Sequence, residues 1–336
     1  MKWLWIGLLV VLLAIATGAY VWNSGAPAIP PGTCPALLSA APFDANAVGY
    51  ADLTSLRSSE LSSRMAAFEK TPQGAAYRDF VEKTNFHIDR DLDRILFTAS
   101  ADSQGGALIL EGRFDQARIA AFAANIGSMR HYDSRDVYQF RTGNIASTAS
   151  MTILGPNRLA FGMGPGADTQ ILMMADAAKG SEPELHDDLC ARAERVAGAP
   201  FFVVGDVPKS ATSEIASALA REDPDSAHIL RALRGWDVAY WLDGDSVRIA
   251  VEGEFEGRYD ALQARFGLGK LMDTLQRQEQ TLKAGPLASD PAAPVLDALL
   301  KNLGVSVDGR YLRVETSLKK SDLEKLAAAR TTVATN

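Results

Sequence analysis

The sequence lacks most of the residue patterns on which enzymes and metalloproteins depend. Its four histidines, His87, His131, His186 and His228, show neither H-x-x-x-H nor H-E-x-x-H spacing, which argues against a zinc site. The G-x-S-x-G motif of many hydrolases is absent. The S-L-K-K stretch at 317–320 matches S-x-x-K, but no S-D-N or K-T-G segment accompanies it. We therefore predict no catalytic, cofactor-binding or metal-ligating residue and no cofactor.

Clustered positive charge is missing as well. Lys2 is the only charged residue among the first 22, so the remainder of the chain carries 33 basic and 41 acidic side chains. The basic residues are dispersed rather than gathered on one segment. This pattern argues against a nucleic-acid partner, which would require a basic patch.

Cysteine is scarce, with Cys34 and Cys190 the only two in the chain. In an oxidising compartment an even pair can form a disulfide, which here would tie an N-terminal spacer to the body of the protein. We predict this bridge, with two unrelated thiols as the alternative.

The first 22 residues contain the one long apolar run. Residues 3–22 carry no charge, and as a helix they would span about 30 Å, the thickness of the hydrocarbon core of a bilayer. Aromatic residues lie at both ends of the run, as they do at membrane interfaces, and Lys2 favours a cytoplasmic N-terminus. We predict an uncleaved, single-pass signal anchor in the cell membrane with an extracytoplasmic, periplasm-facing body. The alternative is a signal peptide cleaved after Ala14–Ile15–Ala16, which would release a secreted protein.

Beyond the anchor, the chain reads as an Ala/Pro-rich linker at 23–47 followed by a tandem duplication. "ALILEGRFDQ" at 107–116 is echoed by "RIAVEGEFEG" at 248–257, and both read as the second strand of a hairpin that leads into a helix. Three further pairs recur 154 positions apart: Asp52 and Asp206, Gly155 and Gly309, and Asp168 and Asp322. We predict a first repeat at 36–180, a connector at 181–198 and a second repeat at 199–330.

Each repeat is predicted to be α+β, with a mainly antiparallel sheet built from hairpins and helices packed on one face. In the repeated E-G-x-F-acid motif, the glycine indicates a bulge or a close approach of two backbones. The acidic residue, Asp115 or Glu256, is predicted in the first helical turn, where the helix dipole favours negative charge. We interpret the motif as structural, because glycine and phenylalanine carry no acid–base chemistry.

One further stretch, "FHIDRDLDRILF" at 86–97, followed by the strand end "GRFD" at 112–115, resembles uncharacterised exported proteins from acidobacterial genomes. The resemblance covers about residues 36–175 and implies no catalytic or ligand residue. Asp89, Asp91 and Asp93 also have the spacing of a calcium loop. Arg94 and Ser100, however, occupy the glycine and glutamate positions of an EF-hand, so we predict an ion-paired turn that caps the next strand.

The anchor, the linker and the missing catalytic patterns favour a membrane-anchored extracytoplasmic binding or scaffold protein without catalytic activity, whose body binds an envelope protein or peptide. A carrier or sensor of an apolar, lipid-like ligand is the first alternative, because a sheet with helices on one face can enclose an apolar cavity. A hydrolase with a site not visible in the sequence is the second, since catalytic triads are recognised by geometry rather than spacing.

Overall fold

The protein is described from a computed structural model, which divides the chain into two compact units. One lies within residues 23–206 and the other within residues 207–336. The structure describes residues 38, 41–42, 45–54, 57, 65–72, 74–99, 106–132, 135–142, 147–164, 166–177, 187–209, 212–213, 216–217, 220, 223–283, 301–319 and 321.

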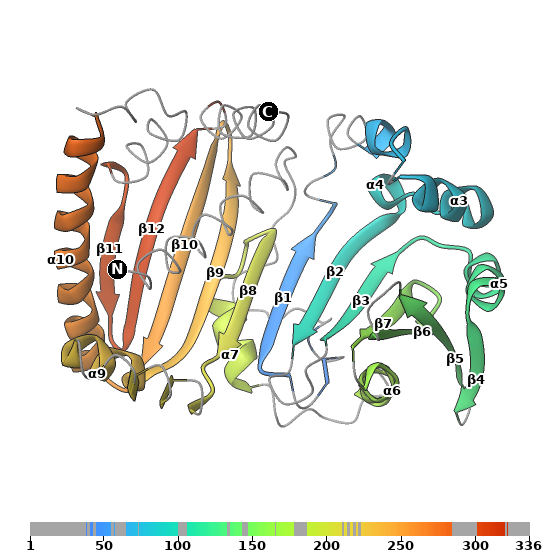
Figure 1. The fold of residues 1–336 in the computed structure, drawn as a ribbon, viewed down its shortest axis with the longest axis horizontal. Coiled ribbons are helices and arrows are strands. Elements are labelled where there is room, and N and C mark those ends of the chain that lie inside the picture. Colours follow the sequence, from blue (N-terminus) through green and yellow to red (C-terminus); the bar gives the residue numbers. More distant parts are fainter. Residues whose placement is uncertain are drawn as a thin grey trace. The chain divides into compact units, whose positions relative to one another are not determined.

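The first unit is built on an antiparallel sheet (Figure 1). Its strands run in the order β8-β1-β2-β3-β7-β6-β5-β4. They are β1 (Ala47–Asp52), β2 (Leu92–Ala99), β3 (Gly106–Gly112), β4 (Ser128–Tyr132), β5 (Arg135–Thr142), β6 (Ser147–Gly155), β7 (Arg158–Met163) and β8 (Phe201–Asp206). The antiparallel α+β class predicted from the repeated hairpins is confirmed for this unit.

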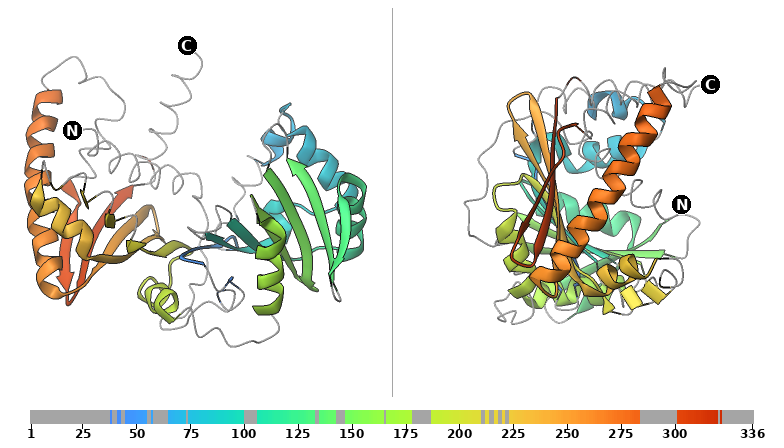
Figure 2. Two further views of the ribbon diagram at one scale, coloured as in Figure 1. Left: turned by 60° about the horizontal axis from the view of Figure 1, so that its bottom comes forward. Right: turned by 90° about the vertical axis from the view of Figure 1, so that its left-hand side faces the viewer.

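Helices cover both faces of this sheet, so the prediction that they pack on one face is wrong here. The described helices are α3 (Ala75–Thr84), α4 (Ile88–Asp91), α5 (Gln116–Ile126), α6 (Ala167–Ala177) and α7 (Asp187–Arg195). α5 packs on the face that carries Tyr138 and Met151. α6 lies on the opposite face (Figure 2). There, Gln139 and Ser150 donate hydrogen bonds to its Asp168.

The physical reason lies in strands that are apolar on both sides. Side chains that alternate along β3, such as Ile109 and Leu110, point to opposite faces of the sheet. Leu110 packs with the α5 cluster. Ile109, its cross-strand neighbour Leu96 and Ala160 of β7 are 0 % exposed. The continuous apolar run in β3 is therefore typical of a strand buried on both faces, rather than of a strand with one face in water.

The second unit is a smaller antiparallel sheet with the strand order β11-β12-β10-β9. Its elements are α9 (Pro224–Ala232), β9 (Leu233–Asp243), β10 (Ser246–Phe255), α10 (Arg258–Lys283), β11 (Gly304–Asp308) and β12 (Tyr311–Lys319). Its two hairpins turn at Asp-Gly pairs, Asp243–Gly244 and Asp308–Gly309, and both glycines have φ 56°. Phe255 and Leu312 of the sheet pack with Ala232 of α9 and Ala261 of α10.

The predicted anchor at 3–22 and most of the linker at 23–47 lie outside the described residues. Within the part of the chain that the structure describes, no helix is both long and apolar enough to cross a bilayer. The anchor therefore stays a prediction.

Candidate functional site

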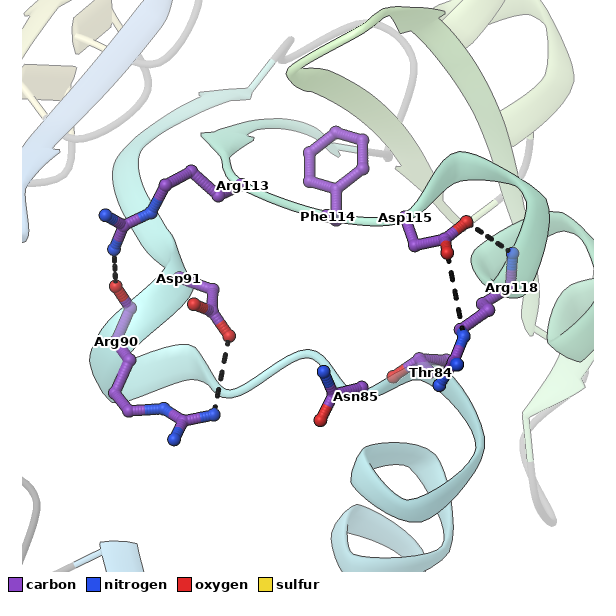
Figure 3. Close-up of a pocket in the computed structure, with 8 residues that line it drawn as sticks. All are labelled: Thr84, Asn85, Arg90, Asp91, Arg113, Phe114, Asp115 and Arg118. Carbon is purple, nitrogen blue, oxygen red and sulfur yellow. Dashed lines mark hydrogen bonds and ion pairs between the residues drawn. The ribbon is translucent and has the colours of Figure 1, made fainter.

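A pocket of about 270 Å³ opens in the first unit where four segments of the chain meet (Figure 3). The segments are the end of α3, the short helix α4, the end of β3 and the start of α5. The lining residues are Thr84, Asn85, Arg90, Asp91, Arg113, Phe114, Asp115 and Arg118. Three of the eight are arginines, so the pocket is rich in hydrogen-bond donors.

A close approach of two backbones at Gly112 holds β3 against α4. A Cβ atom at this position would lie 2.3 Å from the carbonyl oxygen of Asp91. Immediately afterwards, the Arg113 N–H donates to the same oxygen at 2.7 Å. The pairing of β2 with β3 also shifts register between Leu92 and Arg94, opposite this glycine. The prediction that the motif glycine marks a bulge or a close backbone approach is confirmed.

Two helix ends shape the rest of the rim. Asn85 ends α3 in the left-handed conformation, with φ 55°, and its N–H donates to the Val81 carbonyl. Asp115 begins α5 as its N-cap, and its Oδ1 accepts the Arg118 N–H at 3.1 Å. The sequence predicts Asp115 within the first helical turn, whereas the residue lies one position earlier, where a carboxylate satisfies a free N–H group directly.

Both carboxylates of the pocket are committed to the backbone. Asp91 Oδ2 accepts the His87 N–H at 2.8 Å at the start of α4. Asp115 caps α5 in the same manner. Their nearest guanidinium contacts are longer: 3.9 Å from Arg90 Nη2 to Asp91 Oδ2 and 3.6 Å from Arg118 Nε to Asp115 Oδ2. The two carboxylates therefore do not saturate the arginine donors.

The side chains that line the pocket carry a net positive charge. Three arginines against two carboxylates give one excess positive charge. Arg113 donates to the Arg90 carbonyl and has further N–H groups available. Within the described part of the chain, the Asn85 carboxamide has no hydrogen-bond partner. Guanidinium and carboxamide donors around a small cavity are suited to bind a carboxylate or phosphate oxygen.

The hydroxyl and carboxylate groups of the pocket are all engaged in local hydrogen bonds with the backbone. Its one hydroxyl, Thr84 Oγ1, donates to the Phe80 carbonyl at 2.7 Å and so lies in an intrahelical bond. Neither carboxylate is held by a second titratable group in the manner of a catalytic dyad. The arrangement can bind and orient an anion.

Two segments singled out in the sequence, 86–97 and 112–115, come together at this pocket. Arg90 and Asp91 belong to the first, and Arg113, Phe114 and Asp115 belong to the second. The ion-paired turn predicted at Asp89–Asp93 begins as the short helix α4. The charged residues that follow this helix pair mainly with residues outside the 86–97 stretch. Asp93 pairs with Arg57, and Arg94 pairs with Glu111.

The other residues singled out in the sequence lie elsewhere. His131 contacts Asp136 at 2.9 Å in the β4–β5 hairpin, and His228 contacts Asp260 at 3.3 Å in the second unit. Cys190 lies in α7, whereas Cys34 and His186 are outside the described residues. No group of three or more His, Cys, Asp or Glu side chains is placed to hold a metal within the residues that the structure describes.

The sequence did not indicate that Asn85 and Arg118 lie beside Arg90 and Arg113 at one pocket. Neither residue belongs to a repeated motif, and they are 33 positions apart. Only the left-handed end of α3 and the capping of α5 bring them to one rim. The one available signal was the pair of arginines, Arg90 and Arg113, that flank the two ends of the β2–β3 hairpin.

A second hollow, of about 620 Å³, lies between α5 and strands β5 and β6. Its lining combines the apolar or aromatic residues Ala117, Ala120, Tyr138 and Ile153 with the polar residues Gln116, Arg135, Asp136 and Thr152. Its volume is in the range of small-molecule sites. It therefore differs from the arginine-lined pocket in both size and chemistry.

No family model and no curated protein matches this chain. Among solved structures it is similar to TP0453. Crystal form I is 11 % identical, with 92 % of this chain and 99 % of that chain covered and a TM-score of 0.43. Crystal form IV is also 11 % identical, with 89 % of this chain and 96 % of that chain covered and a TM-score of 0.46.

Proposed function

We propose that the protein is a membrane-anchored extracytoplasmic binding protein without catalytic activity, which holds its partner through an anionic group in the arginine-lined pocket. The observation that supports this most directly is the donor surplus of the pocket. Arg90, Arg113 and Arg118 surround a cavity in which both carboxylates already accept backbone N–H groups. An incoming carboxylate or phosphate would supply the acceptors that these donors lack.

The location is inferred from the sequence. Residues 3–22 have the length and the aromatic ends of a membrane-spanning helix, and the linker at 23–47 would separate the body from the membrane. A fixed position at the membrane surface suits a protein whose role is to bind a neighbouring envelope component.

Anion binding in the pocket can be tested by ligand-dependent thermal stabilisation of the full-length protein in detergent. Inorganic phosphate and acetate, added at constant ionic strength, should raise the Tm of the wild type because a ligand bound to the native state stabilises it. The double variant Arg113→Ala/Arg118→Ala should lose the shift. The matched variant Arg231→Ala/Arg265→Ala removes two exposed arginines of the second unit and should retain it.

Partner binding is tested by capture from detergent-solubilised membranes with the same three proteins. An envelope protein recovered by the wild type and the matched variant, and lost by the pocket variant, is the expected result. No anion-dependent shift in the wild type, or a shift that the pocket variant retains, would overturn the proposal.

The larger hollow beside α5 supports a second candidate function, the carriage or sensing of an apolar ligand. Ala117, Ala120 and Ile153 give it an apolar part, and Gln116, Arg135, Asp136 and Thr152 give it a polar part that could hold a lipid head group. Mass spectrometry of organic extracts from purified protein should then detect a stoichiometric lipid. A leucine at Ala120 would fill the hollow and should exclude the lipid, and its retention at full occupancy would count against this candidate.

We also propose that the two predicted repeats, 36–180 and 199–330, arose by tandem duplication. Support comes from strand order within each unit: β2-β3-β7-β6 in the first matches β9-β10-β12-β11 in the second. The β4–β5 hairpin would be an insertion in the first copy. An experimentally determined structure tests this by superposition, which should place Glu111 on Glu252. A best fit that pairs strands in a different order would contradict the proposal.

A further inference from the structure

Asp91 gives the arginine-lined pocket a hydrogen-bond acceptor that is still available to a ligand. Its Oδ2 accepts the His87 N–H at 2.8 Å, whereas its Oδ1 accepts no hydrogen bond from the residues that the structure describes. The Asp91 side chain is 21 % exposed and lies between Arg90 and Arg113 (Figure 3). The pocket therefore presents an anionic acceptor directly beside guanidinium donors.

Asn85 brings a further acceptor and further donors to the same cavity. Its carboxamide has one oxygen and two N–H groups, and none of them has a hydrogen-bond partner in the described part of the chain. Figure 3 shows Asn85 on one side of the opening and the ring of Phe114 on the other. A ligand that uses all of these groups carries an acceptor for the arginines, a donor for Asp91 and a small apolar part beside Phe114.

The charge of the pocket favours a carboxylate over a phosphate. Three arginines against two aspartates leave one positive charge, which a single carboxylate neutralises. A phosphate monoester carries about −1.5 to −2 near pH 7 and would exceed that charge. Its oxygens are also acceptors, so one of them would lie against Asp91 Oδ1 without a proton to share.

The size of the pocket favours the end of a chain over a whole small molecule. Its volume of about 270 Å³ lies just under the range of about 300–1,000 Å³ that is usual for drug-sized ligands. The C-terminal residue of a peptide carries its carboxylate and its amide N–H on the same carbon atom. That spacing matches a pocket in which Asp91 lies between two arginines.

We propose that the pocket binds the C-terminal residue of a peptide chain, with Asp91 as the residue that distinguishes this ligand from other anions. The terminal carboxylate accepts hydrogen bonds from Arg90 and Arg113, the last amide N–H donates to Asp91 Oδ1, and the side chain contacts Phe114. Capture of a terminal carboxylate is a recurring mode of peptide recognition. The inference rests on the proposed function, because it names the anionic group through which the partner is held.

The test compares two ligands that differ in one hydrogen-bond donor. N-acetylalanine has the carboxylate and the N–H of a chain end, and O-acetyl-lactate has the same shape with an ester oxygen in place of the N–H. Dissociation constants come from the concentration dependence of the Tm of full-length protein in detergent, at constant ionic strength. The wild type should bind N-acetylalanine about tenfold more tightly than O-acetyl-lactate, because the N–H donates to a charged acceptor. Inorganic phosphate should bind more weakly than N-acetylalanine.

The role of Asp91 is tested with Asp91→Asn. The carboxamide oxygen can still accept the His87 N–H and so preserve the start of α4, whereas the amide group replaces Oδ1 with a donor. This variant should still bind both ligands, and their dissociation constants should agree to within about twofold. Asp79→Asn removes an exposed carboxylate of α3 that pairs with Lys83, and it should retain the preference of the wild type.

A chain end is distinguished from a free acylated amino acid with a longer ligand. N-acetylated pentaalanine should bind at least as tightly as N-acetylalanine, and its C-terminal amide should not bind. Equal binding of N-acetylalanine and O-acetyl-lactate by the wild type would overturn the inference. So would a preference that Asp91→Asn retains, tight binding of phosphate, or failure of the pentapeptide to bind. In each of these cases an anion still occupies the pocket and the proposed function stands, whereas the absence of stabilisation by any anion would overturn both.

Discussion

Glu111 of β3 lies opposite Arg158 of β7, and its Oε2 atom accepts a hydrogen bond from Arg158 Nε at 3.0 Å. On the other side of β3, Arg94 Nη1 of β2 donates to Glu111 Oε1 at 2.7 Å. Asp52 of β1 is in turn the cross-strand neighbour of Arg94. Acidic and basic side chains therefore alternate across four neighbouring strands, and Glu111 is the member on which two arginines depend.

Replacing Glu111 with glutamine should destabilise the protein, because Arg94 and Arg158 would lose their shared carboxylate. We expect the free energy of unfolding to fall by about 2 kcal/mol. This is less than the loss for a fully buried pair, because both arginines are partly exposed. Urea denaturation of the full-length protein provides the measurement. Glu315→Gln breaks more exposed pairs with Arg248 and Arg313 and should cost under about 1 kcal/mol. Equal losses in the two variants would contradict this account.

The two glycines of the repeated motif should differ in their tolerance of a methyl group. A Cβ at Gly112 meets the Asp91 backbone oxygen at 2.3 Å, whereas one at Gly253 meets the side chain of Leu233 at 3.2 Å. A side chain can move aside more easily than a backbone in a strand. We expect Gly112→Ala to cost about 2 kcal/mol and Gly253→Ala less than half of that, measured as the shift in the urea midpoint. A larger loss at Gly253 would show that the close approach at Gly112 does not constrain the fold.

These contacts also indicate how far the sequence alone could lead. The hairpins followed from local signals, since an Asp-Gly pair favours one turn geometry wherever it occurs between apolar strands. The role of Gly112 followed from the repeated motif. The pocket did not, because the proximity of Asn85 and Arg118 depends on the register of β2 with β3 and on two helix ends.

The prediction of helices on one face failed for a different reason. An apolar run such as Ala107–Leu110 fits a strand buried on both sides as well as a strand of irregular alternation. Ile171 and Met174 of α6 are buried, and its Asp168 accepts hydrogen bonds from Gln139 and Ser150. The residues next to Asp168 in the sequence indicate neither its hydrogen bond with Gln139 nor its hydrogen bond with Ser150. β4 was not predicted either, because its four exposed residues lack the alternation of a half-buried strand.

Alkaline pH should destabilise the protein through Tyr50. Burial raises the pKa of Tyr50 to about 12, and the neighbouring Asp52 acts in the same direction. The unfolded chain has the ordinary tyrosine pKa of about 10, so the native state holds this proton more tightly. The resulting stability is complete below about pH 10 and is lost as the pH rises through about 12. Unfolding free energies measured across this range should fall less steeply in Tyr50→Phe. The slope should not change in Tyr259→Phe, which alters an exposed tyrosine.

The predicted bridge between Cys34 and Cys190 can be tested by thermodynamics as well as by thiol counting. Denatured, unreduced protein should contain no thiol that reacts with a maleimide reagent. Cys34→Ser and Cys190→Ser should each lower the free energy of unfolding by about 2–4 kcal/mol, and the double variant by no more than either single variant, because all three remove the same cross-link. Additive losses would indicate two independent thiols.

The anchor decides where every other property of the protein operates. We expect residues 3–22 to remain attached and residues 35–336 to face away from the cytoplasm. The apolar run is long enough to span a bilayer, and cleavage after Ala16 would leave the second pair of aromatic residues, Tyr20 and Trp22, without the membrane-spanning helix that they would flank.

Two measurements test this placement. Protease added to intact spheroplasts should digest the body and leave a short membrane-bound fragment, and the intact mass of the purified protein should include Trp3 and Trp5. Introducing three lysines between Leu8 and Leu13 breaks the apolar run and should abolish membrane retention, because each charge at the centre of a span costs about 3 kcal/mol. The same three lysines placed within the linker, at 24–29, should leave the protein in the membrane. A mature chain that begins at Thr17 and is recovered in the soluble fraction would replace the anchored protein with a freely diffusing exported one.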